Sequence, residues 1–207
     1  AEVKALTDVV VTSSNDKEIV ESFPKEEKII FGPDRNLGSY INSITGREMV
    51  VWNGACDVHE QFSLQKIKEL KDQNPDAEVL AHPECKQSIL QYADVIGSTQ
   101  ALLNYAKDHL EEKIFLVVTE SGILHEMQKA CPEAHFIPVP AEIDNTTPSY
   151  STPHNSTQSK CNECEYMRMC TLQNLRDCLL NENNEVIVDE EIAKDAIRPI
   201  QRMLEMS

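Results

Sequence analysis

Trp52-Asn53-Gly54-Ala55-Cys56-Asp57-Val58-His59-Glu60 is the stretch around which the rest of the chain is arranged. A hydrophobic strand pattern over residues 48–52 runs into Asn-Gly, a residue pair typical of turns. The turn presents Cys56, and the small Ala55 beside it leaves the thiol room to face a ligand. A single cysteine at a strand end also fits a buried and chemically inert role. Features elsewhere in the chain must decide between these two interpretations.

The composition is that of an ordinary soluble globular protein, with 41% hydrophobic and 26% charged residues among 207. The net charge of −16 argues against nucleic acid or an anionic membrane as a partner, so local donors must capture any anionic substrate. No apolar run approaches the roughly 18 residues of a membrane span, and the first residues lack a secretory pattern. Seven cysteines in such a chain predict a reducing compartment, the cytoplasm, with thiols that are free or metal-bound.

Short apolar runs alternate with helical patterns along most of the chain. The strands are expected at residues 8–11, 28–31, 48–52, 78–81, 94–97, 113–118 and 135–139. The helices between them are expected at residues 16–22, 37–44, 63–72, 87–92, 100–110 and 120–130. Continuous apolar strands separated by helices indicate short parallel sheets with helices on both faces, so the predicted fold class is α/β.

The pattern also repeats itself. Residues 8–13 (Asp-Val-Val-Val-Thr-Ser) resemble residues 94–99 (Asp-Val-Ile-Gly-Ser-Thr), and Lys-Ile-Ile-Phe at 28–31 resembles Lys-Ile-Phe-Leu at 113–116 at nearly the same spacing. This self-similarity predicts two similar three-layer αβα units, residues 1–73 and 74–140, although two unrelated αβ units with common caps would look alike. The second unit opens with a strand and a His-Pro-Glu loop that the first unit lacks, and no methionine begins the chain. We therefore expect an amino-terminal truncation.

The carboxy-terminal part departs from this pattern. Residues 141–160 are rich in Pro, Ser, Thr and Asn and read as a linker. Residues 161–207 form a cysteine-rich and helical segment, with one helix to about residue 180 and a short strand at 185–188. Asp189 then caps a final amphipathic helix, whose buried stripe is expected to contain Ile192, Ala196, Ile200 and Met203.

The remaining cysteines allow several interpretations. Two thiolates spaced as Cys161-x-x-Cys164 can share a soft metal ion or a cluster, but the spacing also fits a redox pair or chance. Cys170 and Cys178 are eight residues apart and would lie on one helix face, where a core role is favoured over ligation. Ordinary buried or edge thiols are expected at Cys85 and Cys131.

Polar residues at element ends suggest where a ligand binds. Ser13 and Thr99 hold matching places in the two repeats, each at the amino end of a helix, where a hydroxyl and free N–H groups can bind an anion or simply cap the helix. His82 and Glu84 flank a proline at the carboxyl end of a strand, the edge at which α/β sheets collect ligands. They fit a general acid/base pair or a solvated turn. Enclosure would raise the pKa of Glu84, while a protonated His82 would lower it.

Taken together, these residues make the chain resemble quinolinate synthase, the iron–sulfur enzyme family of NAD biosynthesis. The resemblance covers nearly the whole chain and is carried, in order, by Ala1-Glu2-Val3-Lys4-Ala5, Thr12-Ser13-Ser14-Asn15, Pro33-Asp34-Arg35-Asn36-Leu37-Gly38, the stretch from Trp52 to Glu60, His82-Pro83-Glu84, Gly97-Ser98-Thr99, the cysteine segment and Pro199-Ile200-Gln201-Arg202-Met203-Leu204.

The resemblance implies a fold of three αβα domains around a pseudo-threefold axis, of which this chain would contain two plus a carboxy-terminal helical segment. It implies a 4Fe-4S cluster at the domain junction, with one cysteine from each region and one open iron. By this match Cys56 and Cys164 are cluster ligands, and Cys161 is an extra cysteine that we do not count. Glu165 stands where the family usually has proline. The family's first domain, which supplies another cluster cysteine, is expected to be absent.

The same resemblance implies the chemistry. The family condenses iminoaspartate with dihydroxyacetone phosphate to quinolinate, phosphate and water, and an L-aspartate oxidase or dehydrogenase would supply the first substrate. Ser13 and Thr99 would hold a phosphate or carboxylate, His82 and Glu84 would contact the substrate, and Glu84 would be the acid/base. The truncated chain is expected to be inactive alone. Two other hypotheses stay open: a non-catalytic zinc module using Cys161, Cys164, Cys170 and Cys178, and a metal-free phosphate-binding domain.

Overall fold

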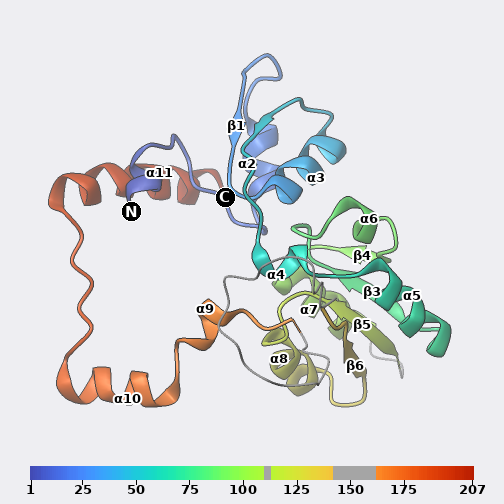
Figure 1. Cartoon of the computed structure of the whole chain (residues 1–207). Coiled ribbons are helices and arrows are strands. Elements are labelled where there is room, and N and C mark those ends of the chain that lie inside the picture. The colour runs from blue at the N-terminus through green and yellow to red at the C-terminus, as the bar shows by residue number, and fades with distance from the viewer. Residues whose placement is uncertain (110–112, 142–161) are drawn as a thin grey trace, which may run out of the picture. The chain divides into compact units, whose positions relative to one another are not determined.

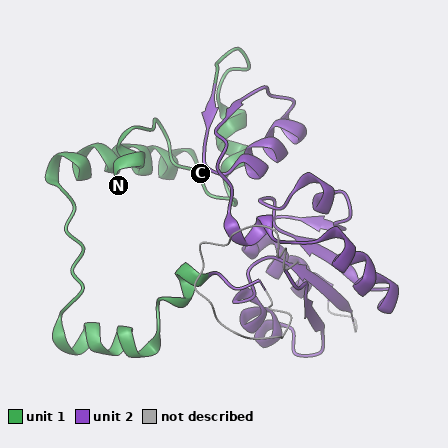
Figure 2. Ribbon diagram, viewed as in Figure 1, with its two compact units in different colours: residues 1–28, 165–207 green, residues 29–164 purple. Residues whose placement is uncertain are grey.

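The computed structural model describes residues 1–109, 113–141 and 162–207. They divide into two compact units, one made of residues 1–28 with 165–207 and the other of residues 29–164 (Figure 2). The boundaries expected from sequence, after residues 73, 140 and 160, stay a prediction, and the proposed linker lies almost wholly outside the described residues. Each unit is taken in turn.

The second unit opens with a βαβ element. β1 (Ile30–Phe31) and β2 (Val50–Val51) form a two-stranded parallel sheet, joined through α3 (Arg35–Thr45). Asp34 caps α3 by accepting hydrogen bonds from two backbone N–H groups of its first turn. The helix ends at Gly46, whose φ of 66° is the left-handed value that glycine adopts without steric cost. Two helices follow, α4 (Asp57–Glu60) and α5 (Leu64–Gln73).

A four-stranded sheet forms the main body of this unit (Figure 1). Its strands and helices alternate along the chain as β3 (Glu78–Ala81), α6 (Gln87–Leu90), β4 (Val95–Ile96), α7 (Thr99–Asp108), β5 (Ile114–Val118), α8 (Ile123–Ala130) and β6 (His135–Pro138). All neighbouring strands are parallel, in the spatial order β4-β3-β5-β6. The chain moves to one side of β3 and then to the other, so the order reverses between β3 and β5. In open α/β sheets, ligands bind beyond the carboxyl ends of the strands at such a point.

Strand periodicity divides the core of this sheet between its two faces. Alternate residues of β3 and β5 point to one face, where they pack with α5 and α6 through Ile67 and Ile89. The intervening residues, including Phe115, pack on the other face with α7 and α8 through Leu102 and Met127. Burying each such side chain contributes roughly 1.5–3 kcal/mol. The predicted α/β fold with short parallel sheets and helices on both faces is confirmed.

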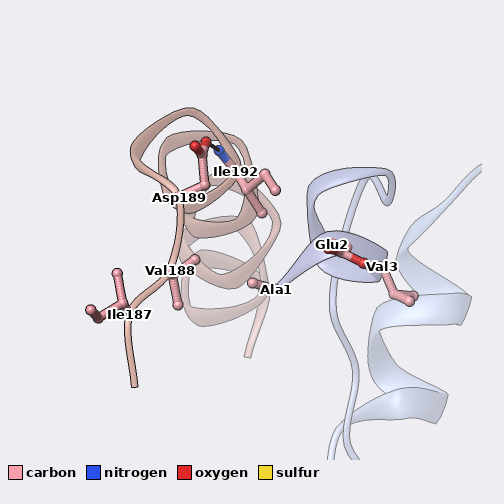
Figure 3. Close-up of a pocket in the computed structure, with 7 residues that line it drawn as sticks. All are labelled: Ala1, Glu2, Val3, Ile187, Val188, Asp189 and Ile192. Carbon is pink, nitrogen blue, oxygen red and sulfur yellow. Dashed lines mark hydrogen bonds between the residues drawn. The ribbon is translucent and has the colours of Figure 1, made fainter. Parts of the chain in front are cut away.

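Among the described residues of the first unit, all regular elements are helices. It contains α1 (Glu2–Ala5), α2 (Asp16–Ser22), α9 (Glu165–Arg168), α10 (Leu172–Asn181) and α11 (Glu190–Met206). Asp189 caps α11, and its inner stripe has Ala196 buried between half-buried Ile192 and Ile200, as expected. A pocket of about 380 Å³ lies between α1 and the start of α11, lined by residues 1–3, 187–189 and 192 (Figure 3).

Three local predictions are wrong. Residues 8–11 do not form a strand, because the Val10 N–H donates to the Pro199 carbonyl of α11 and not to a neighbouring strand. Residues 185–188 have no strand partner among the described residues, and Ile187 is 84% exposed. Cys170 does not share a helix with Cys178, since it precedes α10 and is exposed, so it has no core role.

The predicted buried state of Cys85 and Cys131 is confirmed, since both side chains are fully enclosed. None of the described helices has both the length and the apolar character that crossing a membrane requires.

Candidate metal centre

The candidate site lies where the order of the four-stranded sheet reverses. His82, Pro83 and Glu84 follow β3 directly, and Thr119 follows β5 directly. Because β3 and β5 are parallel neighbours, their carboxyl ends lie together at one edge. Polar residues of these two loops therefore converge, and the cysteine-bearing segment before α4 joins them.

Local bonds fix the position of Cys56. Cys56 is the N-cap of α4, and its backbone N–H donates to Oδ2 of Asp34. Asp34 is only 4% exposed, and its other carboxylate oxygen caps α3. One buried carboxylate therefore fixes both the start of α3 and the backbone of Cys56. Gly54 allows the turn to be this tight, because a Cβ there would lie 2.0 Å from the Trp52 ring.

His59, one helical turn after Cys56, is held on three sides. Its Nε2 lies 3.1 Å from the hydroxyl of Thr119. Its ring stacks on His82, with ring centroids 4.6 Å apart and an interplanar angle of 18°. Its Nδ1 lies 3.0 Å from Oε2 of Glu84, but this contact lacks hydrogen-bond geometry, so the buried nitrogen has no hydrogen-bond partner.

Cys56, His59 and Glu84 form one group of possible metal ligands, here called the Cys-His-Glu group. Their ligand atoms, one from each residue, all lie within 4.8 Å of one another. Over the described residues, no other set of three or more Cys, His, Asp or Glu side chains meets the same condition. Sulfur, imidazole nitrogen and carboxylate oxygen are together a donor set suited to a transition metal ion.

The three titrating residues of this edge affect one another. Burial alone would lower the pKa of His59, but interactions with Cys56 and Glu84 outweigh it and raise that pKa to about 9. Burial, reinforced by the positive charge of His59, lowers the pKa of His82 to about 4. Burial would raise the pKa of Glu84, but His59 and His82 together lower it. Glu84 is thus a charged carboxylate beside a charged His59.

A second set of bonds ties the loop after β3 to the cysteine segment. The Asn36 side chain donates to Oε1 of Glu60 at 2.6 Å and to the backbone carbonyl of Glu84 at 2.9 Å. Arg35 forms an ion pair of 2.9 Å with the other oxygen of Glu60. The amino end of α3, the end of α4 and the loop after β3 therefore form one connected network.

Cys164 is held at the same edge by contacts that are distant in sequence. Its backbone N–H donates to Oε1 of Glu120, in the loop after β5, at 3.3 Å. Asn162, which is 4% exposed, accepts from the Ser121 N–H and donates its side-chain amide to the Val58 carbonyl of α4. The backbone around Cys164 is thus attached both to the loop after β5 and to the helix that Cys56 begins. Cys161 lies outside the described residues.

The two expected anion-binding hydroxyls differ in local setting. Thr99 is the exposed first residue of α7, and Ser98 caps that helix by accepting from the Ala101 N–H. Ser13 lies in the turn before α2, whose capping position is Asn15. The two residues therefore hold different positions relative to the starts of their helices. Their binding of substrate stays a prediction.

Sequence reasoning missed four residues of this edge. His59 had a signal, because it stands in the same quoted stretch, one turn after Cys56. Thr119 follows a buried strand directly, which is the rule that identified His82. The spacing of Asn36 and Asn162 gave no such signal, since their partners lie 48 and 104 residues away.

The predicted zinc alternative is not favoured, because the Cys-His-Glu group contains none of its four cysteines. Cys164 belongs to the second unit, whereas Cys170 and Cys178 belong to the first.

Comparison with known proteins gives a consistent result. A family model described as Quinolinate synthetase A protein matches residues 1–205. A quinolinate synthase of Microcystis aeruginosa is 49% identical over all 207 residues, and those of Chloroherpeton thalassium and a Synechocystis species are 48% identical. In each case the match covers the whole chain and 60% of the relative. The chain thus spans about 60% of the length of the curated relatives it matches.

Proposed function

Because the chain belongs to the quinolinate synthase family, we propose that the protein of which it is part condenses iminoaspartate with dihydroxyacetone phosphate to quinolinate, phosphate and water. The observation that carries the proposal is the convergence of Cys56, His59 and Glu84 at the edge where β3 and β5 end. A thiol, an imidazole and a carboxylate meet there at the ligand-binding position of an α/β sheet.

The proposed cofactor is a 4Fe-4S cluster held in part by Cys56 and Cys164. Thiolates are the protein ligands of such clusters. Both cysteines are free and half-buried, and both belong to segments attached to the same sheet edge. The buried Nδ1 of His59, near Cys56, marks a place where a polar or metallic group fits. When bound, the cluster supplies a Lewis-acidic iron that polarises a substrate oxygen.

The chain's own residues would move the protons. Glu84 is charged because His59 and His82 lower its pKa, so it begins as a general base. His59 and the backbone bond from Asn36 hold Glu84 in position. His82 is stacked on His59 and buried, with its pKa lowered to about 4, so it meets substrate as a neutral imidazole. Ser13 and Thr99 are the proposed donors to a substrate phosphate or carboxylate.

The context of the reaction follows from its chemistry. Iminoaspartate requires a supplier, proposed to be an L-aspartate oxidase or dehydrogenase. Small molecules, and not nucleic acid or membrane, are the proposed partners, in keeping with the charge of −16. A cluster that is held by free thiols favours the reducing cytoplasm as the location.

The test is turnover by the whole protein, purified and loaded with iron and sulfide without oxygen. Iminoaspartate formed in place and dihydroxyacetone phosphate are added, and quinolinate is separated and measured by its ultraviolet absorption. The proposal expects quinolinate to form in proportion to bound iron, and expects Cys56→Ser protein to form none. Iron-loaded wild-type protein that forms no quinolinate would contradict the proposed activity.

A further inference from the structure

We propose that the Cys-His-Glu group binds a single zinc ion when the protein holds no iron–sulfur cluster, with Cys56 Sγ, His59 Nδ1 and Glu84 Oε as its ligands. The three ligand atoms already lie within 4.8 Å of one another. Atoms bound to one tetrahedral zinc are separated by roughly 3–4 Å, given metal–ligand bonds of about 2.0–2.3 Å. The site therefore needs only a small contraction to hold the ion.

The Nδ1 atom of His59 is the observation that points to a ligand. His59 is 6% exposed, and Nδ1 has no hydrogen-bond partner although it is buried. A buried polar atom that is left without a partner destabilises the folded protein. This nitrogen lies 3.0 Å from the Glu84 carboxylate, so an ion that both of them bind would remove that destabilisation.

The surroundings of His59 favour the tautomer that a metal requires. Once zinc displaces the Nδ1 proton of the charged ring, the proton that remains on Nε2 donates to the Thr119 hydroxyl at 3.1 Å, and the lone pair of Nδ1 can bind the ion. Stacking on His82 keeps the ring in this orientation. A histidine whose second nitrogen is hydrogen-bonded in this way is the usual arrangement in zinc sites.

The ligand number and type select the ion. One thiolate, one imidazole and one carboxylate leave a fourth tetrahedral position open, as in catalytic zinc sites. The thiolate disfavours magnesium and calcium, which prefer oxygen ligands alone. The bond from Asn36 to the Glu84 carbonyl and the bond from the Cys56 N–H to Asp34 hold the backbone of both ligands in place before the ion arrives.

The zinc site and the proposed cluster share only Cys56 as a ligand in this chain, and this makes them separable. If the proposed function is right, both zinc and the cluster use Cys56, so they exclude each other. Zinc binding uses His59 and Glu84, whereas the proposed cluster uses Cys164. Zinc in the site would therefore block loading of iron and sulfide until a chelator removes it.

The test uses the protein purified without oxygen and stripped of metal by a chelator in the presence of reductant. Cobalt(II) is added first, because its thiolate complex absorbs visibly and its band intensity reports tetrahedral geometry. Zinc is then titrated in competition with a chromogenic chelator. We expect one zinc per chain and a cobalt–thiolate band that is lost in Cys56→Ser. We expect His59→Gln and Glu84→Gln to bind zinc at least about tenfold more weakly, and Thr119→Val to bind it about tenfold more weakly.

Matched variants guard against unfolding and against binding elsewhere. Cys164→Ser and Cys170→Ser should keep the cobalt–thiolate band, and the exposed His125→Gln should keep the zinc affinity. Circular dichroism shows which variants are folded. If His59→Gln does not fold, Thr119→Val, which keeps the shape of the side chain, tests the site in its place. Wild-type protein that binds no zinc, or a band that survives Cys56→Ser and is lost in Cys164→Ser, would overturn the proposal. If Cys164→Ser loses the cluster but still binds zinc, the zinc site is supported independently of the proposed function.

Discussion

Cys56 and Cys164 reach the same edge of the four-stranded sheet by different routes. Cys56 is held from within the first βα element, with Asp34, 22 positions earlier, accepting from its N–H and Gly54 shaping the turn before it. Cys164 is held by three hydrogen bonds from its segment, residues 162–164, to segments more than 40 residues away. The first position is thus built into the βα elements of the unit, whereas the second depends on a few non-local bonds. We expect the two positions to respond differently to perturbation.

The largest effect is expected from removing either thiol. Cys56→Ser and Cys164→Ser should each reduce cluster iron and sulfide to background, because an alkoxide is a poor substitute for a cluster thiolate. Iron and sulfide analysis with the visible spectrum of the anaerobic protein measures this. The exposed Cys170→Ser is the control and should keep its cluster. If only one of the two variants lost the cluster, Cys56 and Cys164 would not be ligands of a common group.

Next in size is the effect of Glu84 on turnover. Glu84→Gln keeps the shape of the side chain but removes the base, so turnover should fall roughly a hundredfold or more. The cluster should remain, because neither cysteine is changed, and iron content is measured beside kcat. The exposed Glu126→Gln is the matched control. Normal turnover in Glu84→Gln would exclude Glu84 as the base and leave it only a structural role in the turn.

Asp34, which anchors the loop of Cys56, should contribute strongly to the stability of the folded protein. In Asp34→Asn an amide replaces a buried carboxylate that accepts from three backbone N–H groups. At least one donor then faces an NH₂ group, so the free energy of unfolding should fall by about 2 kcal/mol. Urea denaturation followed by circular dichroism measures the change, and Asp72→Asn at an exposed position of α5 should change it little. An unchanged unfolding free energy would show that the Cys56 loop is held by something other than Asp34.

The smallest effect is expected at the anchor of Cys164. Asn162→Ala removes the bond to the Val58 carbonyl, which is worth about 1 kcal/mol. Global stability should change little, while iron should be lost to a chelator about fivefold faster, since 1 kcal/mol corresponds to a factor of about five. The exposed Asn181→Ala is the control. If Asn162→Ala released iron at the wild-type rate, the segment would be held by other contacts.

The sheet and the polar edge that carries His82 and Glu84 were predictable because the signals are local. Buried parallel strands read as continuous apolar runs, and the runs at β3 and β5 were identified in this way. The rule that ligands bind at the carboxyl ends of such strands then identified His82 and Glu84. Residues 8–11 have an equally apolar and β-branched run, yet they form no strand. Strand formation needs a partner, and the pairing of Val10 with Pro199 is a contact across most of the chain.

The details of the site depended on contacts that the sequence does not contain. The lowered pKa of Glu84 arises from His59 as well as His82, and the proximity of His59 follows only from the packing of α4 against the loop after β3. The repeat between residues 8–13 and 94–99 suggested a symmetric pair of hydroxyls. In the structure Thr99 is the first residue of α7, whereas Ser13 lies three residues before α2, whose N-cap is Asn15.

The central claim is that Cys56 and Cys164 bind one iron–sulfur cluster at the edge formed by β3 and β5. The most direct measurement is a crystal structure of the anaerobically loaded whole protein, with iron located by its anomalous scattering. We expect the sulfurs of Cys56 and Cys164 to bond to two irons of the same cluster, with Glu84 and His82 near an iron that no cysteine binds. Iron bound by Cys161 and Cys164 without Cys56, or by Cys170 and Cys178, would contradict the account.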